Sequence, residues 1–414
     1  MGLSNKSVEQ FFIQNNVFYK IINIDEEIDF NQFDILIKSP GIPFNDSLLK
    51  IIENYNIIIM SDIELFYELY PKAKFISITG TNGKTTTTLM VHNLLSHSYK
   101  CYIAGNIGIP IFDLRSTNNF ENEIVIIECS SYMLACTYKF HPNIALITNI
   151  LPNHLDHHLT YEHYENSKLK IIQNMNKEDL LIYSKDLENN IKLKNFNGSK
   201  IIISCNNPVI HLHNNHLYYQ DKLIKEDFSN QFVGIHNYLN FQMAFYVAIY
   251  LGVSIDIIIK QFNEFQLPNY RLEKIYNTNK LIIYNDSKST NQHALINAIE
   301  TLKKDDNIIH LILGGQHRND DWKNLKAVFK KTDVIYLFGE NRFEISKTLD
   351  LINTRYYLEE TLEEVIKYLP KTFNSLNIIL FSPGSPSLDQ YPNYIERGIA
   401  FNNLIFKYYE IGKI

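Results

Sequence analysis

The residues best suited to chemistry stand in the stretch Gly80–Thr85, with the sequence GTNGKT. Two glycines allow a close backbone approach to a ligand, Lys84 supplies a cation for phosphate, and the Thr85 hydroxyl can ligate Mg²⁺. The apolar stretch Phe75–Thr79 before it predicts a buried strand, and Thr86–His97 after it predicts an amphipathic helix. Such a strand, loop and helix N-terminus would direct N–H groups and a positive helix dipole at one point. We therefore predict an ATP-binding P-loop.

The loop is a shorter variant of the usual template, because Ile78 stands where the first glycine of the template would be. The alternative is a glycine-containing turn with a chance lysine. The strand predicted before the loop and the helix predicted after it favour the phosphate loop.

Two further acidic or basic residues follow predicted strands. The apolar run Glu123–Ile127 ends at Glu128, and Asn143–Thr148 leads to His154. Because ligands of open α/β sheets bind beyond the carboxyl ends of the strands, both side chains could face phosphates held by Lys84. Either could instead be an ordinary surface residue.

Several histidines near His154 (His157, His158 and His163) raise the possibility of a zinc site. No HExxH helix or cysteine pair accompanies them, and Asp156 beside an ATP site favours Mg²⁺. Lys168, on the predicted helix Glu162–Ile172, is by itself typical of a surface lysine whose stem lies along apolar surface.

Four loops rich in Asp, Lys, Arg and Ser follow predicted strands near the end of the chain. The strands are Lys280–Tyr284, Ile308–Leu313, Asp333–Phe338 and Asn377–Phe381. Loops are polar in general, but four of them at successive strand ends indicate a second ligand cleft.

The whole chain has the composition of a globular protein, with 414 residues of which 45% are hydrophobic and 20% are charged. A net charge of −6 gives no support for a nucleic-acid or anionic-membrane partner. No apolar run reaches the ~18 residues of a membrane span, and no leader opens the chain, so we expect a cytoplasmic protein without membrane insertion. The four cysteines lack metal-type spacing and are expected to be small buried residues in a reducing compartment.

The order of predicted elements indicates an α/β fold in three domains. Residues 1–72 would form a short Rossmann-like domain, 73–267 a central P-loop domain with a parallel sheet, and 268–414 a second Rossmann-like domain. Within the central domain, residues 180–232 are expected to form a smaller β-rich part before a helix at Gly234–Leu251. The proline at position 268 marks the second boundary.

The first domain is expected to be incomplete. We predict strands at Val17–Ile24 and Asp34–Ile37 and helices at Ser7–Gln14 and Asp46–Asn54. A nucleotide-binding α/β domain normally opens with a strand and a glycine-rich turn, and neither precedes the first helix here. The turn Ser39–Pro43 is either a plain loop or a ligand loop.

The motifs GTNGKTT, ECSSYML, TNILPNHLDHH, SKLK, GIHNYLN, YRLE, NDSKSTN, LILGG and SPGSPSLDQYPNYIERG occur in this order. As an ordered set they resemble the Mur ligase family over nearly the whole chain, most weakly in residues 1–35 and 180–232. NDSKSTN and the SPxxxSxDQ pattern with its trailing ERG resemble the branch of the family that adds D-glutamate.

The resemblance implies an enzyme of peptidoglycan precursor synthesis, an amide-bond-forming ligase that uses ATP and Mg²⁺ and is a monomer. ATP would phosphorylate the carboxylate of UDP-N-acetylmuramoyl-L-alanine, because a free carboxylate is a poor electrophile. The amine of D-glutamate would then attack the acyl phosphate, releasing the amide, ADP and phosphate. Negative charge at the transferred phosphoryl group would require Lys84 and metal ions.

The resemblance also implies a set of site residues. Catalytic roles would fall to Lys84, His154 and Lys168. Mg²⁺ would be held by Thr85, Glu128, His154 and Lys168, the last as a carbamate, which converts a cation into an anionic oxygen ligand. The nucleotide would contact Gly80, Thr81, Asn82, Gly83, Lys84, Thr85, Thr86, Asn240, Arg271 and Asp286. The uridine and muramoyl parts would contact Ser39, Gly41 and Asn106. D-glutamate would contact Lys288, Thr290, Arg318, Ser387, Leu388 and Tyr394.

Some positions depart from the family pattern. The first strand and glycine turn of the uridine-binding domain are missing from the pattern. Met133 replaces a common glutamine, Arg318 replaces a lysine, and Gly384–Pro386 replaces Ala-Cys-Ala. Two alternatives stay open: a sister ligase, such as a folylpolyglutamate synthase or another Mur ligase, and a non-catalytic ATP-binding protein. The intact set Lys84, Glu128, His154 and Lys168 argues against the second.

Overall fold

The computed structural model describes residues 2–22, 29–42, 55, 57–153, 158, 160–228, 232–304, 307–318, 321–329, 331–332 and 334–409. The chain forms two compact units, Met1–Asn230 with His236–Phe265 and Gln231–Ile235 with Gln266–Ile414. Each contains a largely parallel sheet, which confirms the predicted α/β class. The division into three domains stays a prediction. Within the described ranges, no helix has the length and apolarity needed to cross a membrane.

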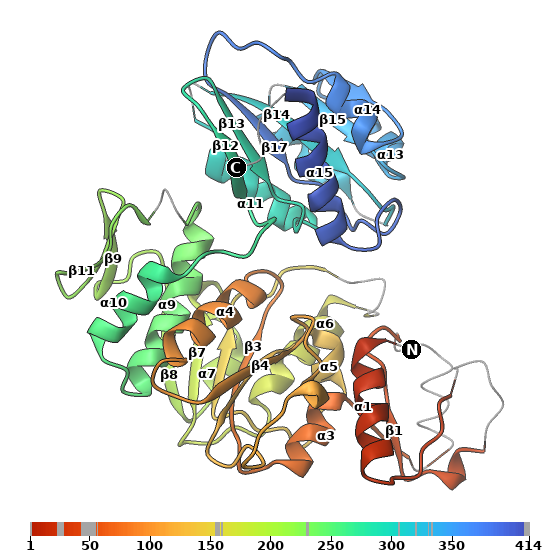
Figure 1. Ribbon diagram of the computed structural model, residues 1–414, viewed down its shortest axis with the longest axis vertical. Coiled ribbons are helices and arrows are strands. Elements are labelled where there is room, and N and C mark those ends of the chain that lie inside the picture. Colours follow the sequence, from red (N-terminus) through yellow and green to blue (C-terminus); the bar gives the residue numbers. More distant parts are fainter. Residues whose placement is uncertain are drawn as a thin grey trace. The chain divides into compact units, whose positions relative to one another are not determined.

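A six-stranded parallel sheet forms the centre of the first unit, in the order β4-β5-β3-β6-β7-β8 (Figure 1). Its central strands are buried on both faces, which explains their continuous apolar sequences. The strands are β3 (Lys74–Thr79), β4 (Cys101–Gly105), β5 (Ile124–Glu128), β6 (Ile144–Ile147), β7 (Leu180–Ser184) and β8 (Ser199–Ile203). The strands predicted at Phe75–Thr79, Glu123–Ile127 and Asn143–Thr148 are confirmed within one residue at each end.

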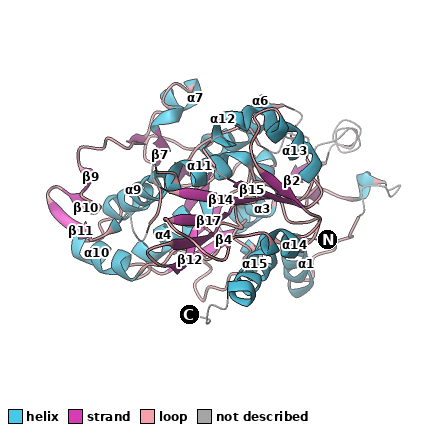
Figure 2. Ribbon diagram, turned by 90° about the horizontal axis from the view of Figure 1, so that it is seen from above, coloured by secondary structure: helices cyan, strands magenta, loops and turns pink. Residues whose placement is uncertain are grey.

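Helices and two smaller sheets complete the first unit. The helices are α1 (Leu3–Gln14), α3 (Asp62–Leu69), α4 (Lys84–Leu95), α5 (Ser131–Ala135), α6 (Tyr161–Leu169), α7 (Ile191–Lys194), α9 (Ile235–Tyr250) and α10 (Ile255–Glu264). Strands β1 (Ile35–Ile37) and β2 (Ile58–Met60) pair in parallel. Strands β9 (Ile210–His213), β10 (His216–Tyr219) and β11 (Lys222–Lys225) form an antiparallel sheet beside α10 (Figures 1 and 2).

Three sequence predictions need correction here. Residues 17–22 contain no strand; an apolar run becomes a strand only where a partner strand takes up its backbone hydrogen bonds. In the region 180–232, β7 and β8 join the central sheet, and only β9–β11 form a separate part. Cys205 is exposed and Cys101 is partly exposed, whereas Cys129 and Cys136 are buried as predicted. The helix predicted at Asp46–Asn54 lies outside the described residues.

The second unit contains a six-stranded sheet in the order β12-β13-β17-β14-β15-β16. Only β12 is antiparallel to its neighbour. The strands are β12 (Glu273–Asn277), β13 (Leu281–Asn285), β14 (Ile308–Gly314), β15 (Val334–Phe338), β16 (Tyr356–Leu358) and β17 (Asn377–Phe381). The helices are α11 (Gln292–Leu302), α12 (Lys326–Phe329), α13 (Arg342–Asp350), α14 (Leu362–Lys367) and α15 (Tyr394–Tyr409).

Two apolar clusters cover the opposite faces of this second sheet. Leu311 and Leu313 of β14 belong to one cluster with α11, α12 and α13, and Ile312 belongs to the other with α14 and α15. This division follows the alternation of side chains along a strand. The polar loops begin at the carboxyl ends of the strands, between these two layers of helices.

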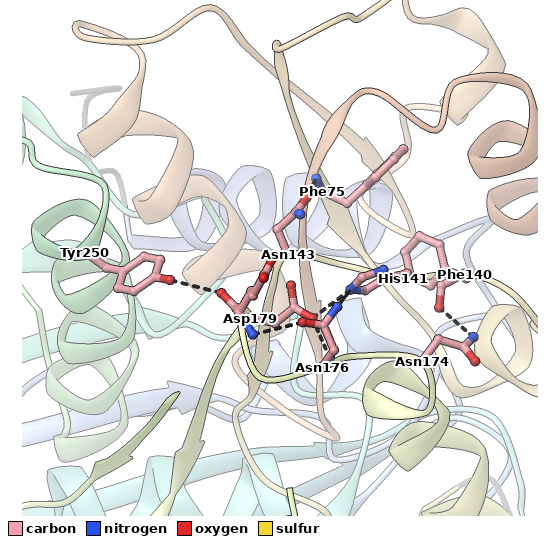
Figure 3. Close-up of polar contacts among 9 residues, drawn as sticks. Phe75, Phe140, His141, Asn143, Asn174, Asn176, Asp179 and Tyr250 are labelled. Atoms are coloured by element: carbon pink, nitrogen blue, oxygen red, sulfur yellow. Dashed lines mark hydrogen bonds and ion pairs between the residues drawn. The ribbon is translucent and has the colours of Figure 1, made fainter. Parts of the chain in front are cut away.

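A polar network joins β3, β6 and β7 at the amino ends of these strands (Figure 3). The Phe75 N–H donates to Asn143 Oδ1 at 2.9 Å, and the Asp179 carboxylate lies 2.7 Å from His141 Nε2 and accepts from the Asn176 N–H at 2.6 Å. These contacts fix the amino ends of the strands. They lie at the opposite end of the sheet from the predicted phosphate loop, which follows the carboxyl end of β3.

Candidate active site

The loop after β3 has a backbone that only glycine can supply at two positions. Gly80 has φ 147° and Gly83 has φ 85°. A Cβ atom at Gly80 would lie 1.9 Å from Thr148 Oγ1, and one at Gly83 would lie 2.6 Å from Asn240 Oδ1. Gly83 caps α4, which begins at Lys84, two residues before the predicted start. The first-turn N–H groups of α4 and the loop therefore face the same region, as an anion site requires.

The end of β6 holds this loop in place. The Thr81 N–H donates to Asn149 O at 2.9 Å, the Asn82 N–H donates to Asn149 Oδ1 at 3.0 Å, and Thr148 Oγ1 donates to Asn82 O at 2.6 Å. The Thr81 hydroxyl lies 2.9 Å from the Tyr164 hydroxyl of α6. The contacts of Asn149 and Tyr164 with the loop are not predicted from the sequence; for Asn149, the polar pair Thr148-Asn149 at the end of an apolar strand is the available signal.

Two lysine amines converge on one carbonyl oxygen of the loop. Lys84 Nζ donates to Gly80 O at 2.9 Å and to Thr81 O at 2.9 Å, and Lys168 Nζ donates to Gly80 O at 2.7 Å. Lys168 is only 2% exposed and lies against the Tyr164 ring, so the surface alternative is wrong. Burial, and secondarily the charge of Lys84, hold the pKa of Lys168 well below its usual range. The Lys168 amine therefore loses its proton more readily than an ordinary lysine, as a nucleophilic amine must.

Glu128 ends β5 and is paired in register with Ile78 of β3, two residues before Gly80. It is 1% exposed, and its Oε1 accepts from Asn106 Nδ2 at 3.0 Å. Its Oε2 is also buried and has no hydrogen-bond partner among the described residues. A buried carboxylate oxygen without a donor is costly, and a hard cation would satisfy it. Glu128 thus fits a Mg²⁺ site, and Thr85, partly exposed in the first turn of α4, adds a suitable hydroxyl.

His154, Asp156 and His157 lie outside the described residues. Of the neighbouring histidines, His158 is fully buried, with its Nε2 2.9 Å from Ser131 Oγ and its ring stacked on Tyr132. Within the described ranges no three His, Cys, Asp or Glu side chains gather as a metal site. Neither the predicted role of His154 nor the zinc alternative is tested by these residues.

In the second unit, Asp286 follows β13 in a buried position. Its carboxylate accepts from the Leu272 N–H at 3.0 Å and from Ser382 Oγ at 2.9 Å. Burial raises the pKa of Asp286 to about 7, and these hydrogen bonds together with nearby arginines oppose the rise. Arg271 is half-buried, and its Nε has no partner among the described residues. Asp286 and Arg271 belong to neighbouring loops of this unit.

The residues predicted for D-glutamate also lie in the loops of the second unit. Lys288 Nζ lies 4.1 Å from the centroid of the Tyr394 ring, so these two are in contact. Ser387 is buried, Leu388 is 63% exposed, and Thr290 and Arg318 are partly exposed. The loops follow β13, β14 and β17, and α15 begins at Tyr394.

Two predicted uridine contacts, Ser39 and Gly41, follow β1 in the first unit. Ser39 lines a mainly apolar cavity of about 800 Å³ formed with α1 and residues 17–22, and Gly41 is exposed. Asn106 lies elsewhere in the same unit, where it donates to Glu128. The cavity and the phosphate loop are therefore separate features of this unit.

The raised pKa of Asp286 predicts a pH-dependent stability. The folded carboxyl keeps its proton up to about pH 7, whereas the unfolded one, with a pKa near 3.8, loses it earlier. The stabilising contribution is complete below ~pH 4 and is lost as the pH rises through 7, a change of a few kcal/mol. The Asp286→Asn side chain cannot ionise. The unfolding temperature of this variant, measured relative to that of the parent protein, should therefore rise steadily between pH 4.5 and pH 8. The exposed control Asp256→Asn should show no such trend, and an equally flat difference for Asp286→Asn would contradict the assignment.

Two family models match this chain. Residues 78–248 match the model of the Mur ligase middle domain, and residues 270–384 match that of the Mur ligase, glutamate ligase domain. The UDP-N-acetylmuramoylalanine–D-glutamate ligase of Petrotoga mobilis is 32% identical over 411 residues, covering 96% of this chain and 93% of the relative. The ligase of the same name from Aquifex aeolicus is 32% identical over 376 residues, covering 90% and 88%.

Solved structures share the fold at lower identity. MurC of Thermotoga maritima is 19% identical with a TM-score of 0.61, covering 91% of this chain and 86% of that one. MurF of the same organism, solved in complex with ADP, is 15% identical with a TM-score of 0.63, covering 91% and 94%. At these identities, the similarity shows a shared fold.

Proposed function

The chain belongs to the Mur ligase family, and on this premise we propose that it ligates D-glutamate to UDP-N-acetylmuramoyl-L-alanine at the expense of ATP. It is an amide-bond-forming enzyme of peptidoglycan precursor synthesis. The observation that supports a catalytic role most strongly is the convergence of Lys84 and Lys168 on the Gly80 carbonyl, with the unpartnered Glu128 oxygen at the end of the neighbouring strand. A binding loop alone would not need a buried second lysine.

The reaction has two chemical steps. A carboxylate oxygen of the L-alanyl group attacks the γ-phosphorus of ATP, forming an acyl phosphate and releasing ADP. The D-glutamate amine then attacks the acyl carbon, and the tetrahedral intermediate collapses to the amide and phosphate. Lys84 balances the charge of the transferred phosphoryl group, and the loop N–H groups hold the remaining phosphates.

Mg²⁺ held by Glu128 and Thr85 would supply the charge neutralisation that phosphoryl transfer needs. We assign His154 and carbamylated Lys168 to a second such ion. The low pKa of Lys168 supports this assignment, because a neutral amine is the form that adds CO₂.

The enzyme would act as a cytoplasmic monomer with domains at 1–72, 73–267 and 268–414, and light scattering of the purified protein tests the oligomeric state.

A coupled assay tests the proposed function directly. The purified chain, ATP, Mg²⁺ and UDP-N-acetylmuramoyl-L-alanine should release phosphate only when D-glutamate is added, and the product mass should equal that of the D-glutamyl adduct. Phosphate release with another amino acid or another acceptor instead would identify a sister ligase. No turnover with any acceptor would favour the non-catalytic alternative.

Arg318 should select for the acidic amino acid. Its place after β14 and its guanidinium, which can pair with a carboxylate through two N–H groups, suit the D-glutamate side chain. Arg318→Ala should raise the KM for D-glutamate at least ~tenfold and leave the KM for ATP nearly unchanged. Arg318→Lys should recover part of the loss. Unchanged D-glutamate kinetics in Arg318→Ala would make this residue a solvated loop charge and transfer the selectivity to Lys288, Thr290 and Ser387.

A further inference from the structure

Arg397 of α15 is fully buried in the second unit, where it contacts two loops rather than a carboxylate. Its Nε donates to Ser287 Oγ at 3.1 Å, its Nη2 to Ser287 O at 2.8 Å, and its Nη1 to Ser385 O at 2.9 Å. It forms no ion pair within the part of the chain that the structure describes. All three nitrogen atoms of the guanidinium thus hold loop oxygen atoms.

The two loops held by Arg397 carry most of the residues proposed for D-glutamate. Ser287 directly precedes Lys288, and Ser385 lies two residues before Ser387. The Ser287 hydroxyl also donates to Tyr394 O at 2.8 Å, which adds the start of α15. Arg397 and Ser287 therefore connect the loop after β13 with the loop after β17 and with the start of α15.

The loop after β14 joins the same network. The Gly315 N–H donates to Asn341 Oδ1 at 3.0 Å, and Asn341 Nδ2 donates to Ser385 Oγ at 2.7 Å. A Cβ atom at Gly315 would lie 2.4 Å from Pro386 O and 3.1 Å from Arg397 Nη1. The segment that leads to Arg318 is thus packed directly against the guanidinium.

A buried guanidinium is energetically expensive. Burial lowers the pKa of Arg397 to about 10, and the charges of Asp389, Tyr391 and Asp286 oppose that change. The group is therefore charged at neutral pH. A planar fork that holds two backbone carbonyls and a hydroxyl at fixed separations offers a geometry that the point charge of a lysine cannot reproduce.

We propose that Arg397 is a positioning residue for the amino-acid substrate, which sets the spacing between the loop of Lys288 and Thr290 and the loop of Ser387. It does not touch the substrate, because it is buried beneath both loops. This inference rests on the proposed function, since the substrate it concerns is D-glutamate.

The test uses Arg397→Lys in the full-length protein, with the exposed Arg355→Lys as a matched control. The KM for D-glutamate should rise at least ~tenfold in Arg397→Lys, because small displacements of substrate-positioning groups are costly. The KM for UDP-N-acetylmuramoyl-L-alanine should change less than about twofold, since neither loop is assigned to that substrate. The KM for ATP should rise less than the KM for D-glutamate, since Asp286 is the one residue of these loops assigned to the nucleotide. Added guanidinium should restore part of the D-glutamate affinity of Arg397→Ala, which a general loss of packing would not allow.

Ser287→Ala is a second, milder variant in case the arginine variants do not fold. It removes the hydroxyl that links Arg397 to Tyr394, and it should show the same selective rise in the KM for D-glutamate. Unchanged D-glutamate kinetics in the folded variants, or equal losses for all three substrates, would overturn the inference. If the unmodified protein itself lacks D-glutamate-dependent phosphate release, the proposed function fails, and the inference falls with it.

Discussion

Replacement of Lys84 by alanine should lower turnover by a factor of 10²–10³ or more, on the order expected for removing a preorganised charged group from a transition state. Lys84 begins α4 and bonds two carbonyl groups of its own loop, so it is already held where a phosphoryl group would enter. The variant loses these bonds but keeps Gly80 and Gly83, which define the loop. Its unfolding temperature should therefore stay close to that of the parent protein.

The measurement is steady-state phosphate release at saturating substrates, with Lys72→Ala as the control. Lys72 is exposed and forms an ion pair with Glu121 at the surface, so its loss should change neither activity nor stability measurably. Near-normal turnover in folded Lys84→Ala would refute the assignment of this loop to the transferred phosphoryl group.

Replacement of Lys168 by alanine should nearly abolish activity, and a small carboxylate should restore part of it. If Lys168 acts as a carbamate, the variant lacks an anionic oxygen ligand, which formate or acetate can replace in the cavity left by the side chain. Lys168 is almost fully buried beside Tyr164 and the Gly80 carbonyl, so that cavity should be small and enclosed. Titration of formate against the rate of Lys168→Ala measures the effect.

Lys84→Ala is the matched control for this rescue, because it lacks a cation rather than an anion. Formate should leave it inactive. Rescue of Lys168→Ala by methylammonium in place of formate would show that Lys168 acts as a cation, and full activity without any additive would remove it from the site.

The phosphate loop could be predicted from the sequence because its determinants are local. A strand, two glycines and a lysine within about ten residues decide its backbone, and the positive φ angles of Gly80 and Gly83 follow from that chemistry. Lys168 is different, since its burial arises from the packing of α6 against the loop. Tyr164 and Lys168 are four residues apart on one face of that helix. This spacing predicts a buried lysine only if that face is already known to be buried.

Arg397 and residues 17–22 are two cases in which the structure depends on contacts between segments that are distant in the sequence. Nothing near Arg397 in the sequence indicates a buried cation, because its partners, Ser287 and Ser385, are brought to it by strands β13 and β17. The run at 17–22 has the composition of a strand, but strand formation depends on a neighbour that composition does not specify. Sequence predictions therefore succeeded where a single segment determines the local structure. They failed where the structure depends on contacts between several segments.

The central claim is that the ligation passes through an acyl phosphate, and isotope transfer tests it most directly. UDP-N-acetylmuramoyl-L-alanine labelled with ¹⁸O in its carboxylate is incubated with the enzyme, ATP, Mg²⁺ and D-glutamate, and the released phosphate is analysed by mass spectrometry. An acyl phosphate requires one carboxylate oxygen to leave with each phosphate, so each phosphate formed from fully labelled substrate should carry one ¹⁸O atom. Unlabelled phosphate, formed at the rate of amide synthesis, would contradict the account.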